Sequence, residues 1–488
     1  MAVIGIDLGT SGCKAVLVAR DGRILASATA EYPLSTPKPL WSEQDPADWW
    51  KGTVAAVQAV VAKAPGEAIE GIGIGGQMHG ATLLDAKDQV VRPAILWNDG
   101  RCQAECDLLH KKVKGLIKET GNRALVGFTA PKLLWVQRHE PKVWAKVRTV
   151  LLPKDYIRFL MTGEKVAELS DGAGMLLVDV AKRRWSKKML AACGIDESYL
   201  GRLIEGTEVS GTVTAAAAQE LGIPAGVPVV GGAGDQAAGA VGAGCVKPGQ
   251  VTIAIGTSGV VFATTKGYSP EPAGRLHTFC HAIPGTWHQM GVMLSAAGSL
   301  QWYRDTLCPG ADFADLLAEA ATAPIGCDGL TFLPYLTGER TPLCDPKARG
   351  GFIGLLRLHT RAHLTRAVVE GICLGLADSL DLIRKAGTTV KEATVTGGGT
   401  RSDLWMQILA DVGNVKVVLR DGADAGPALG GARLALVGAC GVSVAKACAP
   451  GPVAKTFIPN AKAVKAYAAV RARFQALYPS LADHFAGL

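Results

Sequence analysis

Two short apolar runs flank a glycine turn at the start of the chain. Residues 4–18 read Ile-Gly-Ile-Asp-Leu-Gly-Thr-Ser-Gly-Cys-Lys-Ala-Val-Leu-Val, and the turn is Gly9, Thr10, Ser11 and Gly12. This pattern predicts a β-hairpin. Its glycines leave backbone N–H groups uncovered beside two hydroxyls, and such a group of N–H dipoles can hold a phosphate. Many glycine turns are only turns, so the hairpin alone leaves both interpretations open.

The same pattern recurs near the middle of the chain. Residues 251–265 again place a turn, Gly256-Thr257-Ser258-Gly259, between two apolar runs. The two turns are separated by about half of the 488 residues. This spacing predicts two copies of one domain, because short-period repeat proteins have repeats of roughly 20–50 residues. Two such domains facing each other would bring both hairpins to one cleft.

Charged side chains border the first turn. Asp7 comes at the end of the first predicted strand, where it would repel a phosphate unless a metal ion lay between them. Lys14, after the turn, is either a further cation for the phosphates or an ordinary strand lysine.

Further along the first half, the pattern predicts a strand over residues 24–30 and a helix that begins at Asp45-Pro46 and runs to about residue 62. Trp41, in the loop before this helix, either covers the core or forms a wall of a sugar site.

Polar residues follow two predicted strands. A short strand at residues 72–74 leads to Gln77, Met78 and His79, with glycines on both sides. Ligands bind at such strand ends in α/β sheets, although the histidine could also be an ordinary turn residue. A strand at residues 94–97 leads to Asn98-Asp99-Gly100-Arg101, whose donors and acceptors suit a polyol. The alternative is a helix capped by Asp99 with Arg101 at the surface.

A third apolar strand, residues 227–230, leads to Asp235 among small residues. The small residues 237–242 suit a closely packed helix, whose N-terminus would favour an ionised Asp235. The alternative role for Asp235 is that of a helix cap. Lys247-Pro248-Gly249-Gln250 then marks a domain junction, with domains at 1–246 and 247–488.

Composition excludes several classes of function. The net charge of +8 is mild and scattered, with no basic and aromatic array of the kind that binds nucleic acid. Twelve cysteines show no CxxC pair, and no apolar run reaches 18 residues. We therefore expect a cytoplasmic protein with reduced thiols and no membrane contact.

Together these motifs resemble the FGGY carbohydrate kinases, and within that family most closely the members that act on xylulose. The duplicated hairpins are shared with the wider superfamily of sugar kinases, actin and heat-shock chaperones. The resemblance covers nearly the whole chain. Its motifs are Leu40-Trp41-Ser42-Glu43-Gln44-Asp45-Pro46, Gln77-Met78-His79-Gly80, Trp97-Asn98-Asp99-Gly100-Arg101, residues 128–135 and residues 152–156.

The resemblance implies an α/β fold of two ribonuclease-H-like domains facing across an ATP- and sugar-binding cleft. The implied activity is ATP-dependent phosphorylation of a pentulose, D-xylulose at its 5-hydroxyl, in xylose catabolism. Asp235 would be the general base, and Mg²⁺ would be held by Asp7 and Asp235. The implied sugar contacts are Trp41, Gln77, Met78, His79, Asp99 and Asp235. The implied ATP contacts are Gly9, Thr10, Ser11, Gly12, Lys14, Gly256, Thr257, Ser258, Gly398, Gly399 and Ser402.

Two classes of alternative stay open. One is a kinase for another sugar or polyol, such as ribulose, gluconate or glycerol, because a fold does not fix the substrate. The other is a non-catalytic sugar sensor or actin-like protein. The oligomeric state is also open, with a homodimer as one option.

Overall fold

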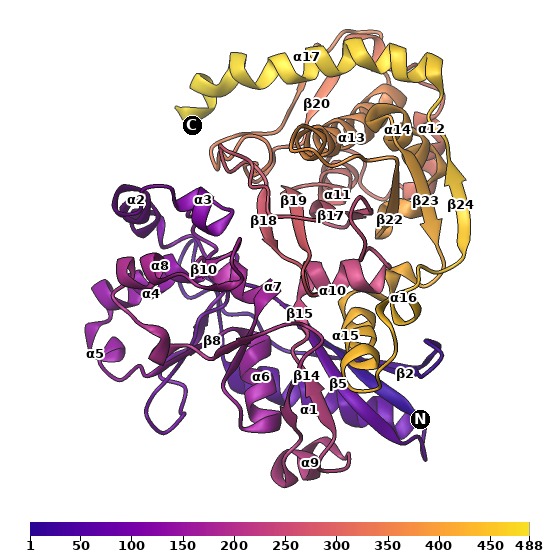
Figure 1. The fold of residues 1–488 in the computed structure, drawn as a ribbon. Coiled ribbons are helices and arrows are strands. Elements are labelled where there is room, and N and C mark those ends of the chain that lie inside the picture. The colour runs from indigo at the N-terminus through magenta and orange to yellow at the C-terminus, as the bar shows by residue number, and fades with distance from the viewer. Residues whose placement is uncertain (488) are drawn as a thin grey trace.

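The computed structural model describes residues 1–487, with Asp424 described by its backbone alone. Two seven-stranded sheets form the two halves of the chain, and helices pack on them (Figure 1). The first sheet has the order β13-β14-β5-β1-β2-β3, with β15 also paired to β5. Its strands are β1 (Ala2–Leu8), β2 (Gly12–Ala19), β3 (Ile24–Glu31), β5 (Ile69–Gly76), β13 (Val209–Thr212), β14 (Pro228–Val230) and β15 (Ala233–Gly234).

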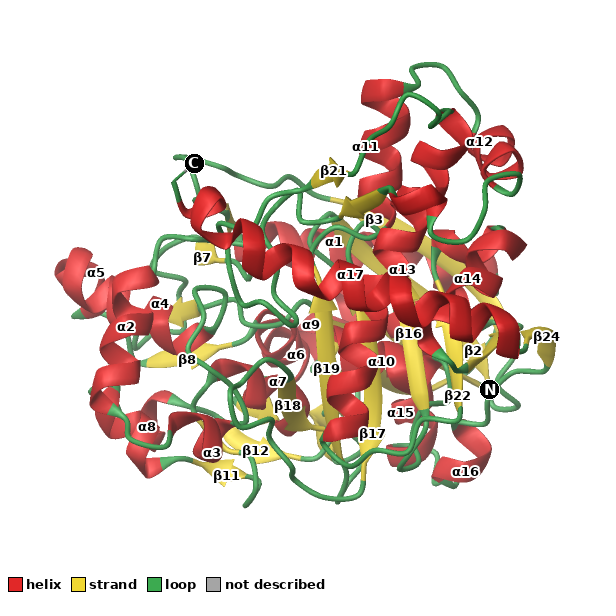
Figure 2. Ribbon diagram, turned by 90° about the horizontal axis from the view of Figure 1, so that it is seen from above, coloured by secondary structure: helices red, strands yellow, loops and turns green. Residues whose placement is uncertain are grey.

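The second sheet has the order β18-β19-β17-β16-β22-β23-β24. Its strands are β16 (Val251–Ile255), β17 (Gly259–Thr265), β18 (His277–Cys280), β19 (Trp287–Met293), β22 (Glu392–Thr396), β23 (Lys416–Arg420) and β24 (Val453–Phe457). Helix α13 (Arg361–Lys385) packs on β17 and β19, and α14 (Asp403–Gly413) packs on β23. Figure 2 shows these helices alongside the strands of this half.

The two sheets repeat one topology. The runs β3-β2-β1-β5-β14 and β19-β17-β16-β22-β23 correspond strand for strand. In each run the first three strands pair antiparallel and the remaining pairs are parallel. Both predicted hairpins are present, as β1-β2 and β16-β17. The predicted two-domain α/β fold is therefore confirmed.

Most predicted elements occur, with shifted ends. Helix α1 (Pro46–Lys63) begins where the sequence predicts, because the Asp45 side chain accepts a hydrogen bond from the N–H of Ala47 at 2.9 Å. The strand predicted at residues 72–74 is the longer β5. The strand predicted at residues 94–97 shortens to β7 (Ala94–Ile95), since the chain turns where Asp99 N–H bonds to the Leu96 carbonyl.

Residues 81–200 form a largely helical lobe beside the first sheet, at the left of Figure 1. Its helices include α2 (Gln103–Lys112), α3 (Leu116–Thr120), α4 (Thr129–His139) and α8 (Lys187–Ala192). This lobe has its own apolar core, and Phe279, Met290 and Val292 from the second half join that core. The lobe therefore forms part of the junction between the halves. No helix of the described chain is long and apolar enough to span a bilayer.

Helix α15 (Gly426–Gly438) comes from the second half of the sequence but packs on β1, β5 and α10 (Asp235–Gly242) of the first half. The packing is backbone against backbone. A Cβ added at Gly73 would lie 2.0 Å from the Gly431 carbonyl oxygen, and one at Gly430 would lie 1.8 Å from that of Ala238. Only glycine fits at these positions, and this contact fixes α10 against the sheet.

We expect Gly73→Ala to lower the free energy of unfolding by about 1–3 kcal/mol or more, because the new methyl group would overlap the α15 backbone. Gly267→Ala is the matched control, since no atom lies within 4 Å of a Cβ there, and its change should stay within about 0.5 kcal/mol. Denaturant unfolding measures both. Equal stability of the two variants would contradict the close packing of α15 on the sheet.

Candidate active site

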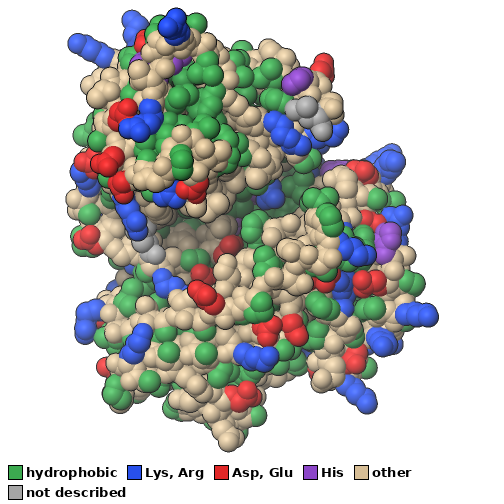
Figure 3. All heavy atoms as spheres, turned by 180° about the vertical axis from the view of Figure 1, so that it is seen from behind, with side chains coloured by type: hydrophobic (Ala, Val, Ile, Leu, Met, Phe, Trp, Pro, Cys, Tyr) green, Lys and Arg blue, Asp and Glu red, His purple; other side chains and the backbone are tan. Residues whose placement is uncertain are grey.

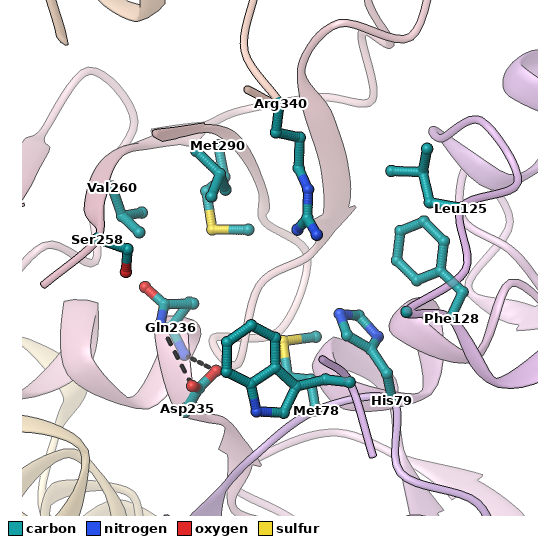
Figure 4. Close-up of a pocket in the computed structure, with 13 residues that line it drawn as sticks. Met78, His79, Leu125, Phe128, Asp235, Gln236, Ser258, Val260, Met290 and Arg340 are labelled. Carbon is teal, nitrogen blue, oxygen red and sulfur yellow. Dashed lines mark hydrogen bonds between the residues drawn. The ribbon is translucent and has the colours of Figure 1, made fainter. Parts of the chain in front are cut away.

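A cavity of about 200 Å³ lies between the two halves. Figure 3 shows the molecular surface hollowed there, and Figure 4 shows the residues that face the cavity. The first half contributes Met78, His79, Trp97, Leu125, Gly127, Phe128, Asp235 and Gln236. The second half contributes Ser258, Val260, Met290, Val292 and Arg340.

Asp235 is the first residue of α10, and Gly234, not Asp235, occupies the cap position. Both of its carboxyl oxygens are held by Gln236, one by the backbone N–H at 2.7 Å and the other by the side-chain amide at 3.3 Å. Burial raises the pKa of Asp235 to about 6, although the bonds from Gln236 oppose the rise. At neutral pH this side chain is therefore mostly an ionised, oriented carboxylate that faces the cavity.

Asp7 lies on β1, which pairs with β5, as does β15, the short strand before Asp235. In the parallel pairings β1-β5 and β5-β15, Asp7 and Ala233 both have Gly75 as partner, so the strands that carry Asp7 and lead to Asp235 end together. Burial and the negative charge of Asp235 raise the pKa of Asp7 to about 7, and the charge of Lys14 opposes this. Lys14 is the cross-strand partner of Asp7.

These two carboxylates fit a divalent cation. Mg²⁺ in nucleotide sites usually takes one or two carboxylates, several waters and the substrate phosphates. Among the residues that the structure describes, no group of three or more metal-ligating side chains occurs. Two carboxylates are a number of protein ligands that Mg²⁺ commonly takes in such sites.

Hydrogen bonds to neighbouring side chains and within the turn hold the first hairpin turn in place. The N–H of Gly9 bonds the carbonyl of Gly12 at 3.0 Å. The Thr10 hydroxyl donates to Gln77 Oε1 at 3.3 Å and accepts from Trp97 Nε1 at 2.9 Å. Gln77 is buried and also donates to Gln44 at 3.0 Å. The structure thus gives Gln77 a role in supporting the turn, and its predicted contact with sugar has no support from its position.

The second hairpin turn faces the cavity from the other half. The carbonyls of Gly256 and Thr257 accept from the backbone N–H groups of Ala297 and Ala296, at 2.9 and 2.8 Å, at the start of α11 (Ala297–Leu307). Thr257 and Ser258 are exposed, and Ser258 lines the cavity. The second turn therefore presents a hydroxyl to the cavity, whereas the first turn is linked to the cavity wall through Trp97, which donates to Thr10.

The glycine loop after β22 lies beside this second turn. A Cβ at Gly399 would lie 2.9 Å from the Ile255 side chain, whereas one at Gly398 would meet no atom within 4 Å. The open face at Gly398 leaves room for a flat ring. The Ser402 hydroxyl instead caps α14, accepting from the N–H of Trp405 at 3.3 Å.

His79 and Met78 line the cavity where the sequence predicts a sugar site. His79 has a positive φ of 70°, and its carbonyl is held by Lys132 at 2.8 Å and by Thr129 at 3.0 Å. Its Nδ1 lies 2.7 Å from the Gly174 carbonyl, which can only accept, so Nδ1 carries the proton. Burial, with a smaller effect from Lys132, lowers the pKa of His79 to about 3. The ring is therefore neutral and Nε2 is free to accept a hydrogen bond.

Two predicted sugar contacts lie elsewhere. Asp99 is fully buried, accepting from the N–H of Ser42 at 2.6 Å and pairing with Arg101 at 2.6 Å. The Arg101 guanidinium lies 3.6 Å from the centre of the Trp41 ring, so Arg101 is not the surface residue considered above. Asp99 and Trp41 are not among the described residues that line the cavity. Their direct contact with sugar stays a prediction that these contacts do not favour.

Several residues of the cavity wall are not among the candidates that the sequence indicates. Trp97 enters the sequence analysis only as part of a motif, and Arg340 is not among its candidates. The apolar wall of Leu125, Phe128, Met290 and Val292 carries no local signal of a site. The only available signal for Arg340 was a charged residue within the polar run Gly338-Glu339-Arg340-Thr341.

We expect Asp7→Asn to stabilise the metal-free protein at alkaline pH. The pKa of Asp7 rises from an ordinary 3.8 to about 7 on folding, so wild-type stability falls as the pH increases between these values. The asparagine variant lacks this loss and should be more stable at pH 8 by on the order of 4 kcal/mol, with the gain shrinking toward pH 4. Denaturant unfolding with a chelator measures it, and Asp21→Asn, in an exposed turn, is the control. A variant no more stable than wild type at pH 8 would contradict the buried, crowded setting of Asp7.

The chain matches known proteins along most of its length. The model for the N-terminal domain of the FGGY family of carbohydrate kinases matches residues 2–242, and that for the C-terminal domain matches residues 251–439. A xylulose kinase from Escherichia coli K12 is 46% identical over 98% of this chain and 99% of its own length. One from Klebsiella pneumoniae is 50% identical over 89% of each chain.

A crystal structure described as a xyloylose kinase from Brucella ovis has the same fold. It superposes with a TM-score of 0.95 at 45% identity, covering 99% of this chain and 100% of the other. The two domain models together cover most of the sequence, and they meet at the cavity that holds Asp235. The chain therefore belongs to the FGGY family of carbohydrate kinases.

Proposed function

We propose that this protein transfers the γ-phosphoryl group of ATP to the 5-hydroxyl of D-xylulose. The observation that carries the proposal is the position of Asp235. Its carboxylate lies in a cavity with Met78 and His79 on one wall and Ser258 of the second hairpin on another. The choice of xylulose is supported by the similarity to relatives that are named xylulose kinases.

In this proposal Asp235 removes the proton from the sugar hydroxyl, at the oxygen that attacks the phosphorus. Gln236 keeps the carboxylate in place, and its pKa of about 6 leaves it ionised but still basic near neutral pH. His79 accepts a hydrogen bond from a sugar hydroxyl through Nε2. The apolar residues of the wall exclude water, which would otherwise compete for the phosphoryl group.

The nucleotide lies between the two hairpins in this proposal. Backbone N–H groups and hydroxyls of Gly9 to Gly12 and of Gly256 to Ser258 surround its phosphates, and Lys14 adds a positive charge. The adenosine part lies over the glycine loop at Gly398 and Gly399, next to Ser402. Asp7 and Asp235 hold Mg²⁺, which when bound neutralises phosphate charge in phosphoryl transfer.

We also propose a domain boundary at 246/247, with helix α15 of the second domain packed back onto the first. The gap between the two matched family regions supports this placement. We assign the protein to the cytoplasm on the basis of the sequence pattern, and the homodimer stays a prediction.

The direct test measures ADP release with a panel of acceptors: D-xylulose, D-ribulose, gluconate and glycerol. We expect D-xylulose to give the highest kcat/KM. A higher kcat/KM for another acceptor would make that acceptor the proposed substrate in place of D-xylulose. If no acceptor increased ADP release, a non-catalytic protein would be favoured.

Asp235→Asn should separate binding from chemistry. Asparagine keeps the size of the side chain but cannot take a proton, so kcat should fall by about 10²–10⁴-fold while both substrates still bind. Asp7→Asn should instead recover part of its activity as Mg²⁺ is raised. The measurement is kcat with both substrates saturating, at low and high Mg²⁺. If Asp235→Asn kept more than about a tenth of wild-type kcat, the base would lie elsewhere.

His79→Ala should raise the KM for D-xylulose by about 5–15-fold, the effect of losing one hydrogen bond of about 1–1.5 kcal/mol, and leave the KM for ATP nearly unchanged. His110→Ala is the matched control, because His110 is not among the described residues that line the cavity and its Nε2 lies 3.3 Å from the Ala124 carbonyl oxygen. An equal loss of apparent affinity for ATP would place His79 on the nucleotide side.

A further inference from the structure

Arg340 brings a positive charge to the sugar side of the cavity from the second half of the chain. It follows β20 (Thr331–Leu333) and is the one lysine or arginine among the described residues that line the cavity. Figure 4 shows its guanidinium pointing into the cavity toward His79, with Asp235 to one side. Three functional groups of different charge therefore line the cavity: a carboxylate, a neutral imidazole and a guanidinium.

The guanidinium has no partner within the described residues, in which no acceptor forms a hydrogen bond or ion pair with it. Its neighbour Glu339 is turned toward the backbone, where its Oε1 accepts from the N–H of Arg340 at 2.7 Å and of Leu294 at 3.0 Å. Arg340 is only partly exposed, and a desolvated guanidinium without an acceptor is costly to keep. Its position is thus suited to an acceptor supplied by a ligand.

The donors of Arg340 indicate which kind of ligand atom it binds. Arginine has five N–H donors and no acceptor, so it needs a ligand oxygen with free lone pairs. In a 2-ketopentose whose 5-hydroxyl is free to react, O5 cannot close the five-membered ring onto C2. The reacting sugar is therefore in the open-chain form, and its C2 carbonyl oxygen can accept hydrogen bonds but donate none.

We propose that Arg340 binds the carbonyl oxygen of the open-chain ketose while Asp235 faces its 5-hydroxyl. This inference rests on the proposed function and extends it, because it names a residue that favours a ketose over the corresponding alcohol. The same donors match a carboxylate, since guanidinium and carboxylate form paired hydrogen bonds. The cavity should therefore also bind five-carbon sugar acids as inhibitors.

The test compares Arg340→Met, Arg340→Lys and wild type, with Arg357→Met as the control because Arg357 is exposed on a loop outside the cavity. Readouts are KM and kcat for D-xylulose, inhibition by xylitol, which lacks the carbonyl, and calorimetric binding of D-xylonate. Thermal unfolding checks that each variant folds. If Arg340→Met does not fold, Arg340→Lys, which keeps the charge, still tests the role of the guanidinium.

We expect Arg340→Met to raise the KM for D-xylulose by about 10–100-fold, the effect of losing a hydrogen bond to a charged group. Inhibition by xylitol should change less than threefold, and D-xylonate binding should be lost. Arg340→Lys should retain D-xylonate binding but not the full affinity for the ketose. Values for Arg340→Met within twofold of wild type for both D-xylulose and D-xylonate would overturn the role of Arg340.

The same measurements distinguish a wrong substrate assignment from a wrong role for Arg340. If wild type rejects D-xylulose but phosphorylates another ketose, the substrate assignment fails while the same comparison with that ketose still tests Arg340. If the accepted substrate has no carbonyl, both the substrate assignment and the role of Arg340 are wrong.

Discussion

The parallel register of β1, β5 and β15 is the constraint on which the site depends. It places Asp7, Gly75 and Ala233 in line at one edge of the first sheet, and Asp235 follows directly. Glycine at residues 73 and 75 of β5 allows α15 and α10 to approach closely, because a Cβ at either position would crowd one of these helices. The backbone contact of α15 with the sheet and with α10 thus fixes the Asp7 carboxylate on β1 relative to the Asp235 carboxylate at the start of α10.

That arrangement is electrostatically unfavourable without a ligand. Burial raises the pKa of both carboxyls, and Asp235 raises that of Asp7 further. A ligand that brings positive charge between them relieves this repulsion. The neutral His79 and the cationic Arg340 also line the cavity, so Asp235 and His79 Nε2 offer hydrogen-bond acceptors there and Arg340 offers donors.

Some polar residues at strand ends in this carbohydrate kinase line the cavity, and others form hydrogen bonds inside the protein. Gln77 and Asp99 were both predicted to bind sugar. In the structure Gln77 supports the first hairpin turn through Thr10, and Asp99 is buried against Arg101 and Ser42. Such residues shape the site without facing it. A side chain with its hydrogen bonds satisfied inside the protein looks the same in the sequence as one that faces a ligand.

The sequence by itself determined the fold and the family. The repeated hairpins predicted two related domains, because short-range patterns of apolar residues, glycines and turns encode local structure. The motifs around Trp41, His79 and Asp99 indicated the family. Only the tertiary structure decided which polar groups face the cavity. Trp97 and Arg340 are more than 200 residues apart in the chain, and no local pattern records that packing brings them to one space. The direction of each side chain depends on its distant neighbours, so Arg340 was identified only once its surroundings were known.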